Sequence, residues 1–207
     1  MVFVKVCGIT NLEDALAAAE AGADALGFNF YERSPRYIAP EEARRIVSQL
    51  PAGMMSVGVF VNESGPRQVA LKADLAGMTA VQLHGDESPE YCRELKGRFV
   101  IKALRVGARF DPQSVTAYET EAILLDAFAG AERGGTGHVF DWRLARSVRQ
   151  LVPQLFLAGG LSPENIAGAI AAVGPDAVDA CSGLECSPGR KDTELLRAFV
   201  RAARAAC

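Results

Sequence analysis

Short runs of β-branched residues alternate along the chain with Ala- and Leu-rich segments whose apolar positions recur with helical period. This alternation predicts an α/β fold with a parallel sheet. Eight runs are the expected strands: Val2–Cys7, Ala25–Phe30, Ser56–Val61, Ala80–Leu83, Phe99–Leu104, Ala122–Asp126, Gln154–Ala158 and Ala177–Cys181.

Several of the expected helices begin with a recognisable signal. The segment Asn11–Ala21 opens with a capping asparagine and has Asp14 in its first turn, and Pro40–Leu50 has a proline at its first position. The dipeptide Ser162-Pro163 predicts a further helix start of the same kind. A last helix over Asp192–Ala206 closes the chain.

The ends of the expected strands recur roughly every 25 residues, and eight such repeats use up the whole chain. We therefore expect a closed (β/α)8 TIM barrel, with residues 1–207 as a single catalytic domain. An open doubly wound sheet is the alternative, but its first turn should carry a GxGxxG phosphate cradle. The first turn here, Cys7-Gly8-Ile9-Thr10, does not carry one.

Composition and charge narrow the possible partners. The chain has 207 residues, of which 49% are hydrophobic, and its net charge is -3. Basic residues are scattered through the helical segments, which argues against a nucleic-acid partner. Lys5 and Gly8 interrupt the apolar N-terminus, and no later apolar run approaches about 18 residues. We therefore expect a soluble, cytoplasmic protein with no membrane partner.

The cysteines and histidines argue against a disulfide framework and against a zinc site. The five cysteines are an odd number and contain no CxxC pair, while the two histidines, His84 and His138, stand far apart. Free cysteines are most often small buried hydrophobes. We interpret four of them in that way: Cys92, Cys181, Cys186 and Cys207.

Cys7 is the exception because it ends the first expected strand and faces a loop of small polar residues. Lys5 lies two positions earlier and therefore on the same side of the strand. An ordinary thiol has a pKa of about 8.5, and lowering it to about 7 requires roughly 2 kcal/mol of preferential thiolate stabilisation. A nearby cation can contribute that, so Cys7 is a candidate general base.

Asp126 ends the apolar run AILLD, and a carboxylate in that place either caps the following turn or serves as an acid. A carboxyl group in a partly apolar barrel mouth has a raised pKa and can donate a proton near neutrality. Active sites of such barrels lie where the strands end. Cys7 and Asp126 would then form an acid–base pair suited to moving protons within one substrate.

Three glycine-rich clusters lie in consecutive late loops and predict a phosphate site. Backbone N–H groups can approach an anion where side chains are absent, and the loops after strands seven and eight of such barrels often bind phosphate. For any one cluster, a tight turn is the simpler interpretation. The clusters are Gly134, Gly135, Thr136 and Gly137; Gly159 and Gly160; and Ser182 and Gly183.

With these motifs in order, the chain resembles the phosphoribosylanthranilate isomerase family from its first strand to its last helix. The residues that carry the resemblance are KVCGIT at 5–10, GFNFYERSPRYI at 27–38, VGVFVN at 57–62, QLHGDE at 82–87, LLD at 124–126, GGTGHVFDW at 134–142, LAGGLSPEN at 157–165 and VDACSGLECSPGRKD at 178–192.

The resemblance implies a (β/α)8 enzyme of tryptophan biosynthesis. It would convert N-(5'-phosphoribosyl)anthranilate into 1-(2-carboxyphenylamino)-1-deoxyribulose 5-phosphate by an Amadori rearrangement, without metal or cofactor. Asp126 would be the general acid and Cys7 the general base, and Arg36 would meet the anthranilate carboxylate. Asp179 would touch the substrate or orient the last loop, and for His84 a structural role is slightly favoured. The protein would be a monomer or a homodimer.

Two other readings remain open at this point. One is another phosphate-binding barrel enzyme, such as the ProFAR isomerase, which resembles this chain in chemistry but has an aspartate where Cys7 stands, or indole-glycerol phosphate synthase, which has a lysine there. The other is a phosphosugar-binding protein without catalysis, which should lack Cys7 or Asp126. The presence of both residues favours the isomerase.

Overall fold

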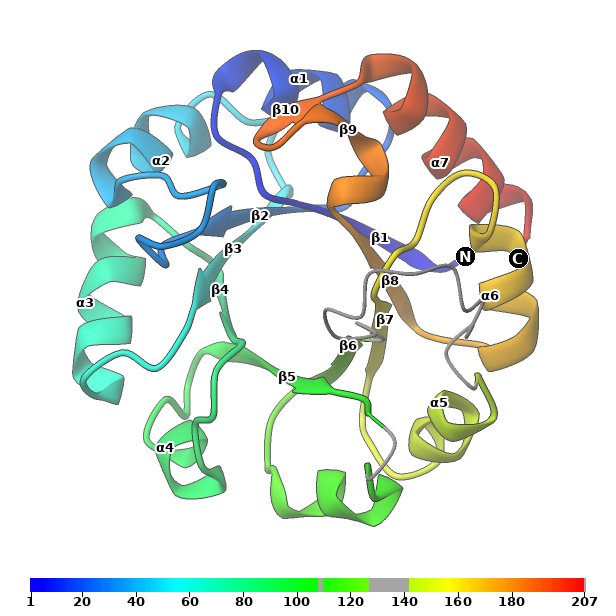
Figure 1. The fold of residues 1–207 in the computed structure, drawn as a ribbon. Coiled ribbons are helices and arrows are strands. Elements are labelled where there is room, and N and C mark those ends of the chain that lie inside the picture. The colour runs from blue at the N-terminus through cyan, green and yellow to red at the C-terminus, as the bar shows by residue number, and fades with distance from the viewer. Residues whose placement is uncertain (108–109, 127–141, 207) are drawn as a thin grey trace.

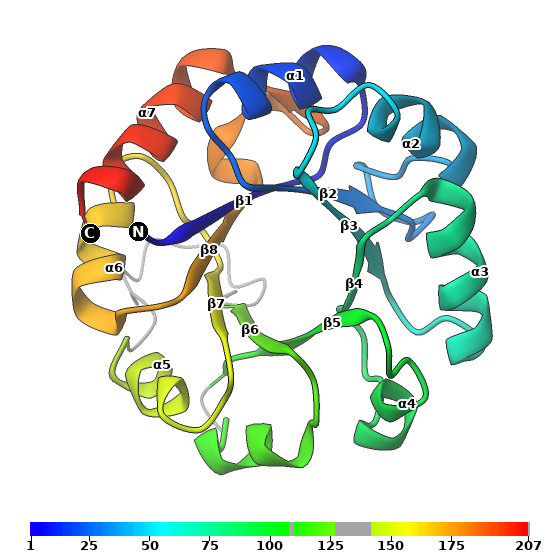
Figure 2. The ribbon, with the colours of Figure 1, turned by 180° about the vertical axis from the view of Figure 1, so that it is seen from behind.

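Eight parallel strands close into a barrel at the centre of the molecule in the computed structural model, which describes residues 1–107, 110–126 and 142–206. The strands pair in chain order, and the last pairs with the first. Helices surround the barrel when it is viewed from either end (Figures 1 and 2). The strands are β1 (Phe3–Cys7), β2 (Ala25–Asn29), β3 (Met55–Phe60), β4 (Ala80–Leu83), β5 (Phe99–Arg105), β6 (Ala122–Asp126), β7 (Leu155–Ala158) and β8 (Ala177–Ala180).

The predicted (β/α)8 barrel is therefore confirmed, and each predicted strand ends within one residue of the observed bounds. The described helices lie in the expected connections, although two of them, η1 and η2, are short 3-10 helices. None of these helices combines the length and apolarity needed to cross a lipid bilayer. They are α1 (Leu12–Glu20), α2 (Pro40–Val47), α3 (Pro66–Ala76), α4 (Pro89–Arg93), η1 (Pro112–Ala117), α5 (Trp142–Arg149), α6 (Ile166–Val173), η2 (Ser182–Leu184) and α7 (Thr193–Ala205).

Side-chain caps set the first residues of α1 and α7, the helices beside the junction of β1 and β8 that closes the barrel (the barrel seam). Asn11 accepts a hydrogen bond from the Asp14 backbone N–H at 2.9 Å, which opens α1. Asp192 accepts from the backbone N–H groups of Glu194 and Leu195 at 2.9 and 3.1 Å, which opens α7. Each cap satisfies backbone donors that have no partner within the helix.

Two predicted helix bounds are wrong. The helix expected at Ser162-Pro163 begins only at Ile166, because the Asn165 side chain accepts from the Ser162 backbone N–H and donates to the Gly160 carbonyl, both at 2.9 Å, and so closes a turn. The helix expected to run to Leu50 ends at Val47, where i to i+3 bonds of a tightening turn replace the helical ones.

The barrel interior changes character along its length. Alternate strand residues point inward, and in the lower layers they are apolar and tightly packed, as at Ala25, Ile101 and Leu124. The same alternation brings the polar side chains of Lys5 and Asp179 into the upper layers. The carboxyl ends of the strands therefore enclose charged groups above an apolar floor.

A two-stranded hairpin that sequence patterning did not predict follows β8. Its strands, β9 (Glu185–Ser187) and β10 (Arg190–Lys191), pair antiparallel. Hydrogen bonds attach the hairpin to the loop after β1 and to the first turn of α1: Thr10 donates to the Gly189 carbonyl at 2.6 Å, and Asp14 accepts from the Lys191 backbone N–H at 2.9 Å. The hairpin is thereby held over the barrel seam.

Candidate active site

A cavity of about 270 Å³ opens at the carboxyl ends of the strands. Every predicted site residue that lies in the described part of the chain lines it. The remaining four, Gly134, Gly135, Thr136 and Gly137, lie outside the described residues. The predicted residues in the cavity wall are Cys7, Arg36, Asp126, Gly159, Gly160, Asp179, Ser182 and Gly183, and Asn29, Val59, Gln82, His84, Ala158, Leu161 and Cys181 complete the lining.

Cys7 ends β1 with its side chain at the cavity and only 9% exposed. A hydrogen bond from Cys181 is the main cause that holds the pKa of the Cys7 thiol well below its ordinary value, and the cations of Lys5 and Lys191 act in the same direction against the effect of burial. The neighbouring strand makes room for the sulfur, because a Cβ at Gly27 would lie 2.7 Å from Cys7 Sγ. Cys7 is therefore favoured as a thiolate.

Lys5 interacts with two acidic groups, the Asp179 carboxyl and the Cys7 thiol. Its ammonium group is fully buried and lies 2.8 Å from Asp179 Oδ1, beside Cys7. Burial, with a smaller contribution from Cys7, raises the pKa of Asp179 to about 7 although Lys5 opposes the change. The single cation thus favours the thiolate while Asp179 holds a proton more readily than an ordinary carboxyl group.

Asp126 ends β6 and its side chain is 20% exposed at the cavity. Its Oδ2 atom lies 3.2 Å from His84 Nε2, and His84 Nδ1 lies 2.9 Å from the Gln82 amide nitrogen. With that amide as donor, Nδ1 accepts and the Nε2–H group donates to Asp126. His84, for which the sequence favours a structural role, therefore contacts the candidate acid directly.

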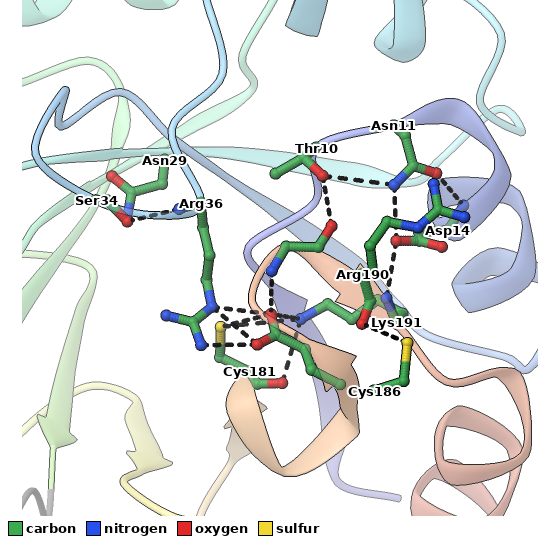
Figure 3. Close-up of polar contacts among 12 residues, drawn as sticks. Thr10, Asn11, Asp14, Asn29, Ser34, Arg36, Cys181, Cys186, Arg190 and Lys191 are labelled. Atoms are coloured by element: carbon green, nitrogen blue, oxygen red, sulfur yellow. Dashed lines mark hydrogen bonds and ion pairs between the residues drawn. The ribbon is translucent and has the colours of Figure 1, made fainter.

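Arg36 lies in the loop between β2 and α2 and is held from the hairpin side. Its Nε and Nη2 atoms donate to the Glu185 carboxylate at 2.8 and 2.7 Å, and this pairing raises the pKa of the guanidinium. Figure 3 shows Arg36, Cys181 and Lys191 converging from three segments of the chain. Arg36 forms part of the cavity wall with its charge fixed in place.

The glycines after β7 and β8 are required by the backbone. Gly159 and Gly160 have φ values of 91° and 64°, in the left-handed region where side chains are disfavoured. At Gly183 a Cβ would collide with the Leu161 carbonyl, so the two loops abut at the cavity edge. This arrangement brings glycine backbone to the wall where an anion was expected.

Sequence reasoning missed three residues of this region. The interpretation of Cys181 as a buried hydrophobe is wrong, because its thiol contacts Cys7 and lines the cavity. Cys186 is exposed, contrary to the same interpretation, whereas Cys92 is buried as expected. Cys207 lies outside the described residues. Glu185 and Lys191 were also missed, because they lie in the short hairpin strands β9 and β10, five and eleven residues after the end of β8.

Comparisons with known proteins agree with this architecture. Residues 4–202 match the family model described as N-(5'phosphoribosyl)anthranilate (PRA) isomerase. The chain is 49% identical to the N-(5'-phosphoribosyl)anthranilate isomerase of Trichlorobacter lovleyi over 206 residues, which cover 100% of both proteins. It is 48% identical to the enzyme of that name from Thermotoga maritima over 205 residues, which cover 99% of each.

Solved structures give the same result. A crystal structure of phosphoribosyl anthranilate isomerase from Thermotoga maritima superposes with a TM-score of 0.92 at 48% identity, covering 99% of this chain and 100% of the other. A crystal structure of phosphoribosyl anthranilate isomerase in complex with reduced 1-(o-carboxyphenylamino)-1-deoxyribulose 5-phosphate has a TM-score of 0.89 at 46% identity, with the same coverage.

Proposed function

This chain belongs to the N-(5'-phosphoribosyl)anthranilate isomerase family, and we propose that Cys7 and Asp126 carry out its reaction as general base and general acid. The enzyme is an intramolecular isomerase of tryptophan biosynthesis. It converts N-(5'-phosphoribosyl)anthranilate into 1-(2-carboxyphenylamino)-1-deoxyribulose 5-phosphate, an Amadori rearrangement. The reaction needs one proton delivered and one removed on the same sugar.

Asp126 delivers the first proton. In its protonated form it gives the proton to the furanose ring oxygen, the ring C–O bond breaks, and a Schiff base forms between the sugar C1' and the anthranilate nitrogen. Asp126 is left as a carboxylate, and the hydrogen bond from His84 Nε2 stabilises the new charge. Its partial exposure, 20%, lets it reach both the substrate and a proton source.

Cys7 removes the second proton. As a thiolate it takes the proton from C2' of the Schiff base, and the electron pair of that C–H bond moves to form the enolamine. The enolamine then tautomerises to the ketone. The hydrogen bond from Cys181 and the buried cation of Lys5 lower the pKa of Cys7 and so favour the thiolate, which is the form the step requires.

Other residues of the same cavity wall would bind the two anionic groups of the substrate. Arg36 is placed to meet the anthranilate carboxylate, since its planar guanidinium matches a carboxylate in a two-point contact. The backbone N–H groups of the loops at Gly159, Gly160, Ser182 and Gly183 would donate hydrogen bonds to the phosphate. The product-analogue complex of the related enzyme carries both a carboxyphenyl group and a phosphate.

The wider setting follows from the same chemistry. We infer that residues 1–207 act as one catalytic domain in the cytoplasm, on a small phosphosugar, without nucleic-acid or membrane partners. A monomer or a homodimer fits the site, which is built from one chain. A related crystal structure shows monomers generated from the dimeric Thermotoga maritima enzyme, which supports a dimer as the first state to test.

The observation that carries the acid–base assignment is the position of Cys7 and Asp126 on the wall of one cavity. Cys7→Ser and Asp126→Asn should each lower kcat by at least about 10²-fold, with KM less changed. Turnover of freshly generated phosphoribosylanthranilate, with ProFAR as a control substrate, measures the effect. Unimpaired turnover in either variant would refute the assignment.

A further inference from the structure

Glu185 is the centre of a charged cluster beside the cavity, although it does not line the cavity itself. Its carboxylate is 4% exposed. Its Oε2 atom accepts from Arg36 Nη2 at 2.7 Å, and its Oε1 atom accepts from Arg36 Nε at 2.8 Å and Lys191 Nζ at 2.9 Å. A buried carboxylate with three charge-assisted contacts is rigidly held, and it holds its partners in turn.

The contact to Arg36 uses one edge of the guanidinium. Nε and one N–H of Nη2 face Glu185, whereas the remaining N–H groups on Nη1 and Nη2 form a second edge. That second edge is the fork that pairs with a carboxylate through two parallel hydrogen bonds. Among the described residues no acceptor for a hydrogen bond from Arg36 Nη1 is found, and Arg36 lines the cavity.

Charge in the cluster favours an anionic ligand. Arg36 and Lys191 are cations and Glu185 is their anion, so the three together carry one net positive charge. Lys191 has a fully buried side chain and requires a carboxylate partner. Burial opposes ionisation of Glu185, but the hydrogen bonds from Arg36 and Lys191 hold its pKa below the ordinary value. Glu185 thus neutralises one cation and leaves the other for the substrate.

We propose that Glu185 is a positioning residue that fixes the plane of Arg36, so that the free edge of the guanidinium selects substrates with an aryl carboxylate. The inference rests on the proposed function, because it takes Arg36 as the group that meets the anthranilate carboxylate. Besides Arg36 and Lys191, Glu185 accepts from the Gly189 backbone N–H at 3.4 Å and the Cys181 thiol at 3.8 Å, and it does not line the cavity. Its effect should appear as substrate selectivity carried by KM.

The effect is measured by comparing kcat and KM for two substrates. One is N-(5'-phosphoribosyl)anthranilate, and the other is its analogue without the carboxylate, N-(5'-phosphoribosyl)aniline. Glu185→Gln should lower the preference for the carboxylate substrate about tenfold, through KM, with kcat within about threefold of wild type. Glu185→Asp keeps the charge that Lys191 needs but withdraws the carboxylate from Arg36, and it should show the same loss even where the glutamine variant folds poorly.

Glu87→Gln is the matched control. Glu87 is as buried as Glu185, at 1% exposed, and pairs with a buried lysine, Lys102, at 2.6 Å, but it does not contact Arg36. This variant should lose stability and keep the substrate preference. If Glu87→Gln changes the preference as much as Glu185→Gln does, the effect is a general consequence of losing a buried carboxylate, and the inference is overturned.

Variants of Arg36 separate the inference from the function on which it rests. Arg36→Ala should abolish the preference, and adding Glu185→Gln to it should change the preference no further, since the two residues act as one unit. If Arg36→Ala abolishes the preference while both Glu185 variants retain it, the role of Glu185 is wrong and that of Arg36 stands. If Arg36→Ala retains the preference, the carboxylate-binding role of Arg36 falls, and this inference falls with it.

Discussion

Two fully buried lysines lie on opposite faces of the same barrel wall, and each pairs with a carboxylate. Lys5 points into the barrel and lies 2.8 Å from Asp179, with 0% of its side chain exposed. Lys102 lies on the outer face of β5, between inward-facing Ile101 and Ala103, and is 2.6 Å from Glu87 with 1% exposed. The two pairs are chemically alike and differ in what surrounds them.

The outer pair is fully satisfied. Lys102 donates to the carbonyls of Leu83 and Gly85 at 3.3 and 2.7 Å, besides its bond to Glu87. Glu87 in turn accepts from the backbone N–H groups of Asn62 and Gly85, at 2.8 and 2.9 Å. Each charge has partners that cannot titrate, so this pair fixes the loop after β4.

At the inner pair, one cation is shared by two acids. Lys5 faces both Asp179 and Cys7, and the two acids compete for the same positive charge. The pKa of Cys7 falls, chiefly through the hydrogen bond from Cys181 and with help from Lys5, whereas burial raises the pKa of Asp179 to about 7. A buried ion pair therefore stabilises the fold where backbone groups satisfy its remaining hydrogen bonds, as at Lys102 and Glu87. Where a further titratable group contacts the pair, as Cys7 does at Lys5 and Asp179, the pair shifts the pKa of that group.

Removal of the outer cation should cost the most stability. Lys102→Met leaves Glu87 buried without its cation, and the free energy of unfolding should fall by about 3 kcal/mol. Turnover should fall by less than about tenfold, because the pair lies outside the barrel and reaches the active site only through the loop that carries His84. Urea unfolding followed by circular dichroism measures the loss. Lys96→Met, at a pair exposed by 67% and 62%, is the control and should stay within about 0.5 kcal/mol of wild type. Equal losses in the two variants would contradict the contrast.

Removal of the inner cation should act on chemistry instead. Lys5→Met takes away a charge that favours the Cys7 thiolate, and kcat/KM should fall about 10²-fold, or about 2.7 kcal/mol. The variant should still fold, because Asp179, whose pKa is already raised to about 7, takes up a proton in place of the lost partner. The pH dependence of Cys7 alkylation by iodoacetamide, followed by mass spectrometry of its peptide, should shift upward. An unchanged midpoint would show that Lys5 does not tune the thiol.

Asp179→Asn tests the competing acid through stability against pH. The pKa of Asp179 rises from an ordinary 3.8 to about 7 in the folded protein. Between these values the native state holds a proton that the unfolded chain releases, so this residue makes the free energy of unfolding fall as pH rises. The variant lacks that slope, and its stability relative to wild type should rise by about 3 kcal/mol between about pH 4 and about pH 7, then level off. Urea titrations across this range check the sign, and a parallel pair of curves would contradict it.

The sequence predicts those features that depend on interactions between residues close together in the chain. The ends of β4 and β6 are predicted at Leu83 and Asp126 as observed, because each apolar run and its polar boundary are local. The hairpin at residues 185–191 was missed because strands of three and two residues show no periodicity.

The missed site residues depend on closure of the barrel. Cys181 follows the β8 residues that pair with β1, so it reaches Cys7 only when the last strand joins the first. The bond between Arg36 and Glu185 likewise joins residues 149 positions apart. Pattern in the sequence could place Cys7 and Asp126 at strand ends, but not the partners that set their chemistry.

The smallest effect is expected at the thiol next to Cys7. The Cys181 hydrogen bond is the first cause of the lowered pKa of Cys7, but a neutral thiol is a weak donor, whereas Lys5 carries a full charge in a buried site. Cys181→Ala should therefore lower kcat/KM only about threefold and raise the alkylation midpoint of Cys7. Cys181→Ser restores a hydroxyl donor in a similar volume and should recover most of the loss. Cys186→Ala, at an exposed sulfur that contacts only the Arg190 carbonyl among the described residues, should match wild type. Equal slowing by alanine and serine would mean that the sulfur acts by packing, and Lys5 would then be the main support of the thiolate.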